Sequence, residues 1–126
     1  RVPFIVHWPG VVKPGTESSA LVSQTDICRS LADIVDEKIP EGSMRDAQNL
    51  SYELLYGKST GRAELIEETG WGAWGFRSGE WKLIPTKKPM LFNLSVDPAE
   101  EHDLADRHPE LVQKLLKRID EIRKQY

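Results

Sequence analysis

The pattern of apolar and polar residues predicts helices in the first half of the chain and short strands in the second half. The first apolar run, residues 4–6, ends at Pro9 and Gly10 and predicts a buried strand of a covered parallel sheet. Parallel strands need neighbours joined by long crossovers. No crossover precedes this run, so we expect a portion of a larger protein. An unpaired edge at residues 4–8 would also invite self-association between copies.

Helical spacing is clearest in two segments. Ser23 and Asp26 are placed as in a capping box and predict a helix start. The helix should end before Pro40, because the residue preceding a proline avoids the α region. Its apolar stripe, expected to face the core, consists of Ile27, Cys28, Leu31, Ile34 and Val35. A second long helix is predicted from Pro109, since proline suits the first helical position. Its apolar stripe consists of Leu111, Val112, Leu115, Leu116, Ile119 and Ile122.

The middle of the chain predicts one short helix followed by a small antiparallel sheet. Residues 51–56 are predicted to form one or two helical turns that end at Gly57. Short apolar runs then follow, separated by glycine, proline or lysine, at residues 62–68, 73–77, 80–84 and 90–94. Ser78 and Gly79 lie between two of these runs and predict a hairpin turn. The predicted fold class is therefore α+β, with the sheet packed by the C-terminal helix.

Composition excludes some partners and leaves others open. The 126 residues are 39% hydrophobic and 29% charged, with a net charge of −3, which gives no reason to expect nucleic-acid binding. No apolar run reaches the roughly 20 residues that a membrane span requires. The single cysteine, Cys28, excludes an internal disulfide and leaves the compartment undecided.

Residues able to carry chemistry are sparse. The histidines, His7, His102 and His108, have no metal-ligand spacing, and the acidic run 97–103 is interpreted as a solvated turn. Cys28 lies on the predicted apolar stripe and is expected to be a buried, inert thiol. These residues alone form no catalytic constellation.

Four tryptophans divide into two groups. Trp8 and Trp81 lie within predicted strands and are interpreted as structural. Trp71 and Trp74 alternate with glycines and are candidates for an aromatic rim against a substrate. Packing of both rings against the sheet is the favoured alternative.

The order of motifs resembles one family, the sulfatases. Residues 1–10 with 12–15 look like a strand and turn late in the sulfatase catalytic domain, and residues 21–26 with 31–33 are similar to the helix that follows. The hairpin 76–84 resembles the family's arginine-variable-glycine-variable-tryptophan-lysine-leucine motif. The closing turn and final helix are matched by residues 91–94, Asp97, Pro98, Glu100, Leu104, Ala105 and 108–110.

The resemblance implies an alkaline-phosphatase-like α/β parent that hydrolyses sulfate esters of a small molecule or glycan. It implies a division into the end of the catalytic domain at 1–40, a connecting segment at 41–59 and a C-terminal subdomain at 60–126. The parent is expected to use a formylglycine, made from the first residue of a Cys/Ser-x-Pro-Ser/Ala-Arg motif, and a divalent cation, usually calcium. Cys28 does not open that motif. No catalytic, cofactor-binding or metal residue of the family is therefore carried onto this chain, which is expected to be inactive alone.

Two alternatives stay open. The chain would also suit the tail of a related phosphodiesterase or phosphonate monoester hydrolase, because the tail does not distinguish sulfur from phosphorus. A stand-alone interaction module is the other alternative. The resemblance leaves periplasmic, secreted and lysosomal locations open.

Overall fold

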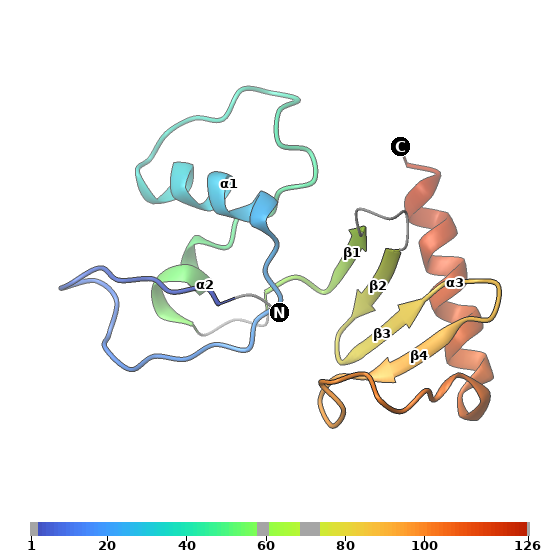
Figure 1. Ribbon diagram of the computed structural model, residues 1–126. Coiled ribbons are helices and arrows are strands. Elements are labelled where there is room, and N and C mark those ends of the chain that lie inside the picture. Colours follow the sequence, from blue (N-terminus) through green and yellow to red (C-terminus); the bar gives the residue numbers. More distant parts are fainter. Residues whose placement is uncertain (1–2, 58–60, 69–73, 126) are drawn as a thin grey trace. The chain divides into compact units, whose positions relative to one another are not determined.

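The computed structural model describes residues 3–57, 61–68 and 74–125, and the chain divides into two compact units, Arg1–Ala63 and Glu64–Tyr126. The first unit contains helices and long connections, and the second contains an antiparallel sheet and a long helix (Figure 1). The α+β class predicted from the sequence is confirmed. The three-part division at residues 40 and 59 stays a prediction.

Helix α1, Gln24–Ile34, begins where the capping-box spacing predicted. The backbone N–H of Ser23 donates to Asp26 Oδ2 at 2.9 Å, and the Ser23 hydroxyl accepts from the first turn. The short helix α2, Ser51–Tyr56, ends at Gly57, whose φ of 61° is the left-handed conformation that glycine adopts freely. Both predicted helices of this unit are therefore confirmed.

The side of α1 that is buried is polar, which contradicts the predicted apolar stripe. Asp26 and Ser30 are completely buried, whereas Cys28 is exposed and Leu31 and Val35 are 52% and 69% exposed. The prediction that Cys28 is buried is wrong. The physical reason is that the loop before α2 supplies backbone N–H groups to be satisfied, and polar side chains on α1 satisfy them.

The predicted strand at residues 4–6 is also wrong. Residues 3–8 have no regular secondary structure, and Phe4, Ile5 and Trp8 are 53%, 86% and 43% exposed. A strand forms only where a neighbour completes its hydrogen bonds, and none of the described residues pairs with this segment. Trp8 is therefore not part of a strand. Self-association stays a prediction, without an edge strand at 4–8 to support it.

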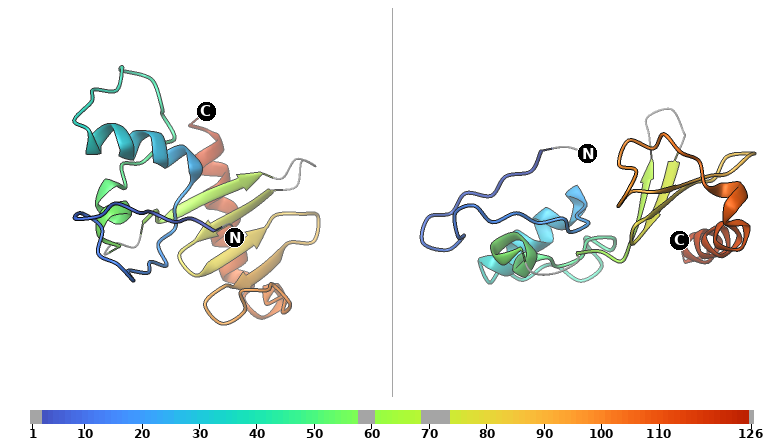
Figure 2. Two further views of the ribbon diagram at one scale, coloured as in Figure 1. Left: turned by 60° about the vertical axis from the view of Figure 1, so that its left-hand side comes forward. Right: turned by 90° about the horizontal axis from the view of Figure 1, so that it is seen from below.

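The second unit contains a four-stranded antiparallel sheet in the order β1-β2-β3-β4. Its strands, close to the predicted runs, are β1 Glu64–Glu68, β2 Trp74–Ser78, β3 Trp81–Ile84 and β4 Met90–Asn93. The predicted hairpin joins β2 to β3 through Gly79, whose φ is 56°. Figure 2 shows this meander as one twisted layer.

Helix α3, Pro109–Arg123, follows a short 3₁₀ turn, η1 Ala105–Arg107, and covers one face of the sheet (Figures 1 and 2). Phe76, Leu83 and Leu91 lie in register on adjacent strands and are fully buried. They meet Val112, Leu115 and Ile119 of α3, in the core predicted by the helical stripe. Trp81 packs against this core, with its ring 5.3 Å from that of His108, as its structural interpretation predicted. In the part of the chain that the structure describes, no helix is both long and apolar enough to cross a membrane.

Candidate functional site

A cavity of about 440 Å³, open to solvent, lies on the second unit beside α3. Apolar side chains form its floor, since Ile119 is buried in the core and Leu116 is half-buried. Polar side chains of α3 form one wall, and Trp74 at the start of β2 forms part of another. The polar lining residues are Gln113, Lys117, Asp120 and Arg123. An apolar floor with a few convergent polar groups is typical of ligand sites.

Trp74 is the sequence-predicted residue that the structure brings into this cavity. Its side chain is half-buried against the core, and the guanidinium carbon of Arg123 lies 4.1 Å from its ring centroid. Trp74 therefore both packs against the sheet and lines an open cavity, so the two interpretations of its role are compatible. Trp71 lies outside the described residues. Substrate contact by either ring stays a prediction.

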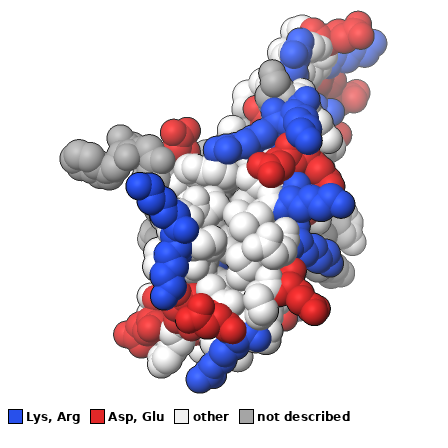
Figure 3. All heavy atoms as spheres, turned by 90° about the vertical axis from the view of Figure 1, so that its right-hand side faces the viewer, with Lys and Arg blue, Asp and Glu red and all other residues white. Residues whose placement is uncertain are grey.

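The charged face around α3 is mixed rather than of one sign. Figure 3 views the structure from the side on which α3 lies in Figure 1, and shows an uncharged area bordered by basic and acidic side chains. Arg118 on α3 pairs with Glu64 of β1 at 2.9 Å and with Glu121 at 3.3 Å. Among the described residues, no carboxylate forms an ion pair with Arg123 or Lys117.

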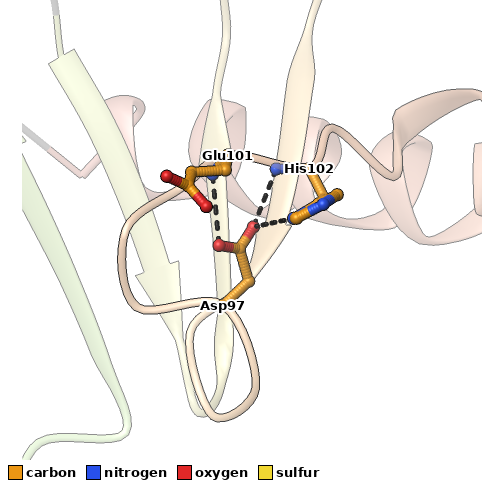
Figure 4. Close-up of side chains that lie close together, drawn as sticks. All are labelled: Asp97, Glu101 and His102. Atoms are coloured by element: carbon orange, nitrogen blue, oxygen red, sulfur yellow. Dashed lines mark hydrogen bonds and ion pairs between the residues drawn. The ribbon is translucent and has the colours of Figure 1, made fainter.

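The acidic run after β4 forms an exposed turn, as the sequence predicted. Ligand atoms of Asp97, Glu101 and His102 lie within 4.8 Å of one another (Figure 4). The carboxylate of Asp97 accepts backbone N–H groups of His102 at 2.9 Å and Glu101 at 3.1 Å, and these hydrogen bonds lower the pKa of Asp97. The turn itself therefore accounts for the position of Asp97, and the cluster gives no further sign of a cation site.

A buried charged network in the first unit was not found by sequence reasoning. The carboxylate of Asp26 accepts hydrogen bonds from Arg62 Nε at 2.6 Å, Gln48 N at 2.8 Å and Ser23 N at 2.9 Å. Arg62 also donates through Nη2 to Asp26 Oδ1 and to the carbonyl of Asp46. Burial by itself raises the pKa of Asp26, but these hydrogen bonds outweigh burial and hold its pKa below the usual range.

This network cross-links the first unit rather than presenting a reactive group. Every donor that faces Asp26 is used within the unit, and the Arg62 side chain is only 9% exposed. Ser30 extends the network by accepting the Leu50 N–H at 2.8 Å and donating to the Asp26 carbonyl at 2.7 Å. Asp26 and Arg62 are 36 positions apart in the sequence, which explains why no local signal predicted the pair.

Cys28, His7 and His108 are not among the residues that line the cavity. Cys28 is exposed on α1 in the first unit. His7 is exposed in the irregular segment before residue 10. His108 is the residue before α3, and its ring lies 5.3 Å from that of Trp81 in a tilted arrangement. No local sequence pattern singled out Arg123, because its place over Trp74 depends on tertiary packing.

Sequence comparison identifies relatives that match nearly the whole chain. It is 31% identical to an N-acetylgalactosamine-6-O-sulfatase of Bacteroides thetaiotaomicron, over 98% of this chain and 27% of that protein. It is 27% identical to arylsulfatase G of Rattus norvegicus, over 97% of this chain and 27% of that protein. No family model matches the sequence.

Solved structures agree with these relatives. One, described under the metabolism of multiple glycosaminoglycans by Bacteroides thetaiotaomicron, superposes with a TM-score of 0.87 at 31% identity, over 97% of this chain and 29% of that one. Another, BT4656 in complex with D-glucosamine-2-N,6-O-disulfate, has a TM-score of 0.72 at 20% identity and shows the shared fold.

The fold and the sequence matches together define the chain as a member of the sulfatase family. It corresponds to a C-terminal part of such a protein, as the order of motifs predicted. The chain spans about 27% of the length of the curated relatives that it matches.

Proposed function

We propose that this chain is part of an enzyme that hydrolyses sulfate esters of a saccharide. The observation that carries the proposal is the 31% identity, over 98% of the chain, to a protein named as an N-acetylgalactosamine-6-O-sulfatase. The relatives reported above are sulfatases, which favours sulfur over phosphorus as the reacting centre. A stand-alone interaction module is less well supported, since the similarity extends over both units of the chain.

The hydrolytic chemistry itself is assigned to residues outside this chain. A formylglycine and a divalent cation are implied for the parent, where they would supply the nucleophile and stabilise negative charge. No residue here matches the family's nucleophile motif, and the acidic cluster around Asp97 is accounted for by its turn. No hydrolytic step is therefore derived for this chain, which should be inactive alone.

The first role proposed for this chain is to complete the core of the parent. Helix α1 buries Asp26 and Ser30 within its own unit and leaves Cys28, Leu31 and Val35 exposed. Exposed apolar faces of this kind usually mark an interface. The remainder of the parent is the proposed partner of this face, since the chain spans only about 27% of the two curated relatives reported above.

The second proposed role is to shape the wall of the substrate pocket. Trp71 and Trp74 are the candidate contacts, since aromatic rings beside polar groups commonly bind ligands. The position of Trp74 at the open cavity supports this role. Unaltered substrate kinetics of Trp71→Ala in the parent would remove the part assigned to Trp71.

The reaction class is tested with the parent protein and with the 126-residue chain in parallel. The parent should release sulfate from an aryl sulfate and should act more slowly on the matching aryl phosphate and phosphonate esters. The isolated chain should release neither product. A parent that prefers the phosphate ester would replace this proposal with the phosphodiesterase alternative, and turnover by the isolated chain would refute its assigned inactivity.

The core-completing role has its own experiment. Leu31→Ser and Val35→Ser should lower the melting temperature of the parent, because they place hydroxyl groups in an apolar interface. The same variants should make the isolated chain more soluble, since there the face meets water. Glu37→Ser, at an exposed polar position just beyond the same helix, is the matched control and should change neither quantity. Equal effects of all three variants would contradict the role.

A further inference from the structure

The cavity beside α3 contains an arginine that lies over a tryptophan ring and whose N–H groups have no acceptor among the described residues. Arg123 lies with its guanidinium carbon 4.1 Å from the Trp74 ring centroid, within the range of a cation–π contact. Stacking uses the flat face of a guanidinium and leaves its N–H groups, which point outward in the plane, available to other acceptors. Arg123 is exposed, and no hydrogen bond or ion pair of its guanidinium is found among the described residues.

Contact with Trp74 also reduces the side-chain entropy that Arg123 would lose on binding a ligand. A free arginine loses side-chain entropy when it is fixed by a ligand. Contact with the half-buried Trp74 ring restricts the Arg123 side chain before any ligand arrives. Planar N–H groups held in this way match the oxygens of a tetrahedral oxyanion two at a time. Phosphate and sulfate share that arrangement of oxygens.

Two further donors line the same cavity on α3. Lys117 is exposed and has no carboxylate partner among the described side chains, and Gln113 lies one helical turn before it. Asp120 lies in the same lining. Its carboxylate would oppose a bare anion but would accept hydrogen bonds from sugar hydroxyls. This mixture favours a ligand that carries one anionic group and several hydroxyl groups.

We propose that the cavity formed by Trp74, Lys117, Asp120 and Arg123 binds a sulfated saccharide, with the sulfate group held by Arg123 and Lys117. The apolar floor, which includes Leu116 and Pro85, suits the carbon face of a sugar ring. The choice of sulfate rather than phosphate rests on the function proposed above. The geometry by itself requires only an oxyanion attached to a polyhydroxylated body.

The experiment measures binding to the 126-residue chain by nuclear magnetic resonance. A monosulfated disaccharide, the same disaccharide without sulfate, and inorganic sulfate are titrated separately, and the Trp74 indole N–H and Arg123 Nε–H signals are followed. The sulfated disaccharide should shift both signals. The unsulfated disaccharide should bind at least about 10-fold more weakly, the size expected for losing a charge-assisted hydrogen bond. Inorganic sulfate should also bind more weakly, because it lacks the sugar's hydroxyl groups and carbon face. Inorganic sulfate that binds as tightly as the disaccharide would overturn the saccharide part of the proposal.

Matched variants test the assigned residues. Arg123→Gln and Lys117→Gln should each weaken binding of the sulfated disaccharide about 10-fold or more. Lys114→Gln removes the same charge from an exposed position of α3 outside the named lining and should leave affinity within about twofold. All three positions are exposed on the helix, so the variants should have the same melting temperature as the unmodified chain. Equal losses in Lys114→Gln and Arg123→Gln would refute the site and leave only nonspecific attraction.

The result is separable from the reaction class of the parent. Binding to the isolated chain requires no hydrolysis, so a parent without sulfatase activity would refute the proposed function and leave the binding result standing. Conversely, a parent that hydrolyses an aryl sulfate while its isolated C-terminal chain shows no shift at Trp74 would refute the saccharide site alone. Asp120→Asn gives a further check. If this variant lost binding to the sulfated and unsulfated disaccharides equally, recognition would depend on the sugar hydroxyls and not on Arg123. That result would also overturn the proposal.

Discussion

Replacing Asp26 with asparagine should destabilise the first unit more than the same substitution at another aspartate of α1. Four donated hydrogen bonds converge on the Asp26 carboxylate, two of them from Arg62. An asparagine has one acceptor oxygen, so it retains at most about half of these bonds and directs an NH₂ group at the remaining donors. Asp26 is completely buried and the Arg62 side chain is 9% exposed, so water does not replace the lost partner.

The magnitude follows from what is left unpaired. Removing one member of a buried ion pair typically costs about 3–5 kcal/mol, because a charge then remains buried without a partner. Two lost hydrogen bonds to a charged group, at about 1.5–3 kcal/mol each, give a similar value. This loss is comparable with the whole stability of a small domain, about 5–15 kcal/mol. The first unit of Asp26→Asn should therefore be largely open while the second unit stays folded.

Amide hydrogen exchange resolves the two units in one experiment. The Leu50 N–H, which donates to Ser30 Oγ at 2.8 Å, reports the first unit without contacting the substituted carboxylate. The Leu94 N–H, which donates to the Glu80 carbonyl at 2.8 Å, reports the second unit. Exchange at Leu50 should accelerate by about 10²–10³-fold or more in Asp26→Asn. Exchange at Leu94 should be unchanged.

The matched control is Asp33→Asn, the same substitution at an exposed position of α1. Asp33 accepts a 2.5 Å hydrogen bond from Ser51 Oγ, but water is available to both groups when that bond weakens. Its effect on Leu50 exchange should therefore be much smaller. In the double variant Asp26→Asn/Arg62→Gln, part of the loss should be recovered, since no guanidinium remains buried and unpaired. Equal acceleration in Asp26→Asn and Asp33→Asn would refute this account of the network.

Gly61→Ala should destabilise the first unit by about 1–3 kcal/mol, because Gly61 has a φ of +70° and an added Cβ would lie 2.3 Å from the Leu21 carbonyl oxygen. Gly10→Ala, with a φ of +83° but open space around it, should cost less in the same urea titration. Ile119→Ala should cost the second unit about 2–5 kcal/mol, since this side chain is 2% exposed in the core, and loss of near-ultraviolet circular dichroism would measure it. Hydrogen bonds from the backbone N–H groups of Leu91 and Ala105 lower the pKa of Asp103. Ionised Asp103 therefore stabilises the folded state above the unfolded pKa of about 4, and this stabilisation is lost as the pH falls through the folded pKa. Asp103→Asn should flatten that part of the acid-unfolding profile.

Each of these expectations has a contradicting result. Equal destabilisation by Gly61→Ala and Gly10→Ala would show that the cost at Gly61 comes from its backbone conformation and not from the close approach to Leu21. A loss below about 1 kcal/mol for Ile119→Ala would mean that the core collapses around the missing atoms. An acid-unfolding profile unaffected by Asp103→Asn would assign the pH dependence to other carboxylates.

The predicted elements were most accurate where the signal was local. Four local signals lie where the sequence placed them, and each acts on its immediate neighbours. They are the N-cap Ser23, the first helical residue Pro109, the closing Gly57 and the turn glycine Gly79. The alternating runs of the sheet and the stripe of α3 bury each other within one unit. Short-range chemistry and a self-contained core are therefore sufficient to explain the second unit from sequence.

The wrong predictions share a different cause. Whether an apolar segment is buried depends on which other segment of the folded protein packs against it. The stripe containing Leu31 and the run at residues 4–6 have apolar patterns, yet no described element covers them. In the candidate site, the sequence identified Trp74 but not Arg123, because 49 residues separate Arg123 from the ring that it covers.

The sequence by itself determined the α+β class, the positions of the three α-helices and of the four strands of the sheet, and the sulfatase resemblance that relatives over 97–98% of the chain confirm. Tertiary structure alone decided which face of α1 is buried, which charges pair and which side chains share a cavity. The physical reason is range. Caps, turns and periodicity act within a few residues, whereas the Asp26–Arg62 pair and the Trp74–Arg123 stack join residues that only the folded chain brings together.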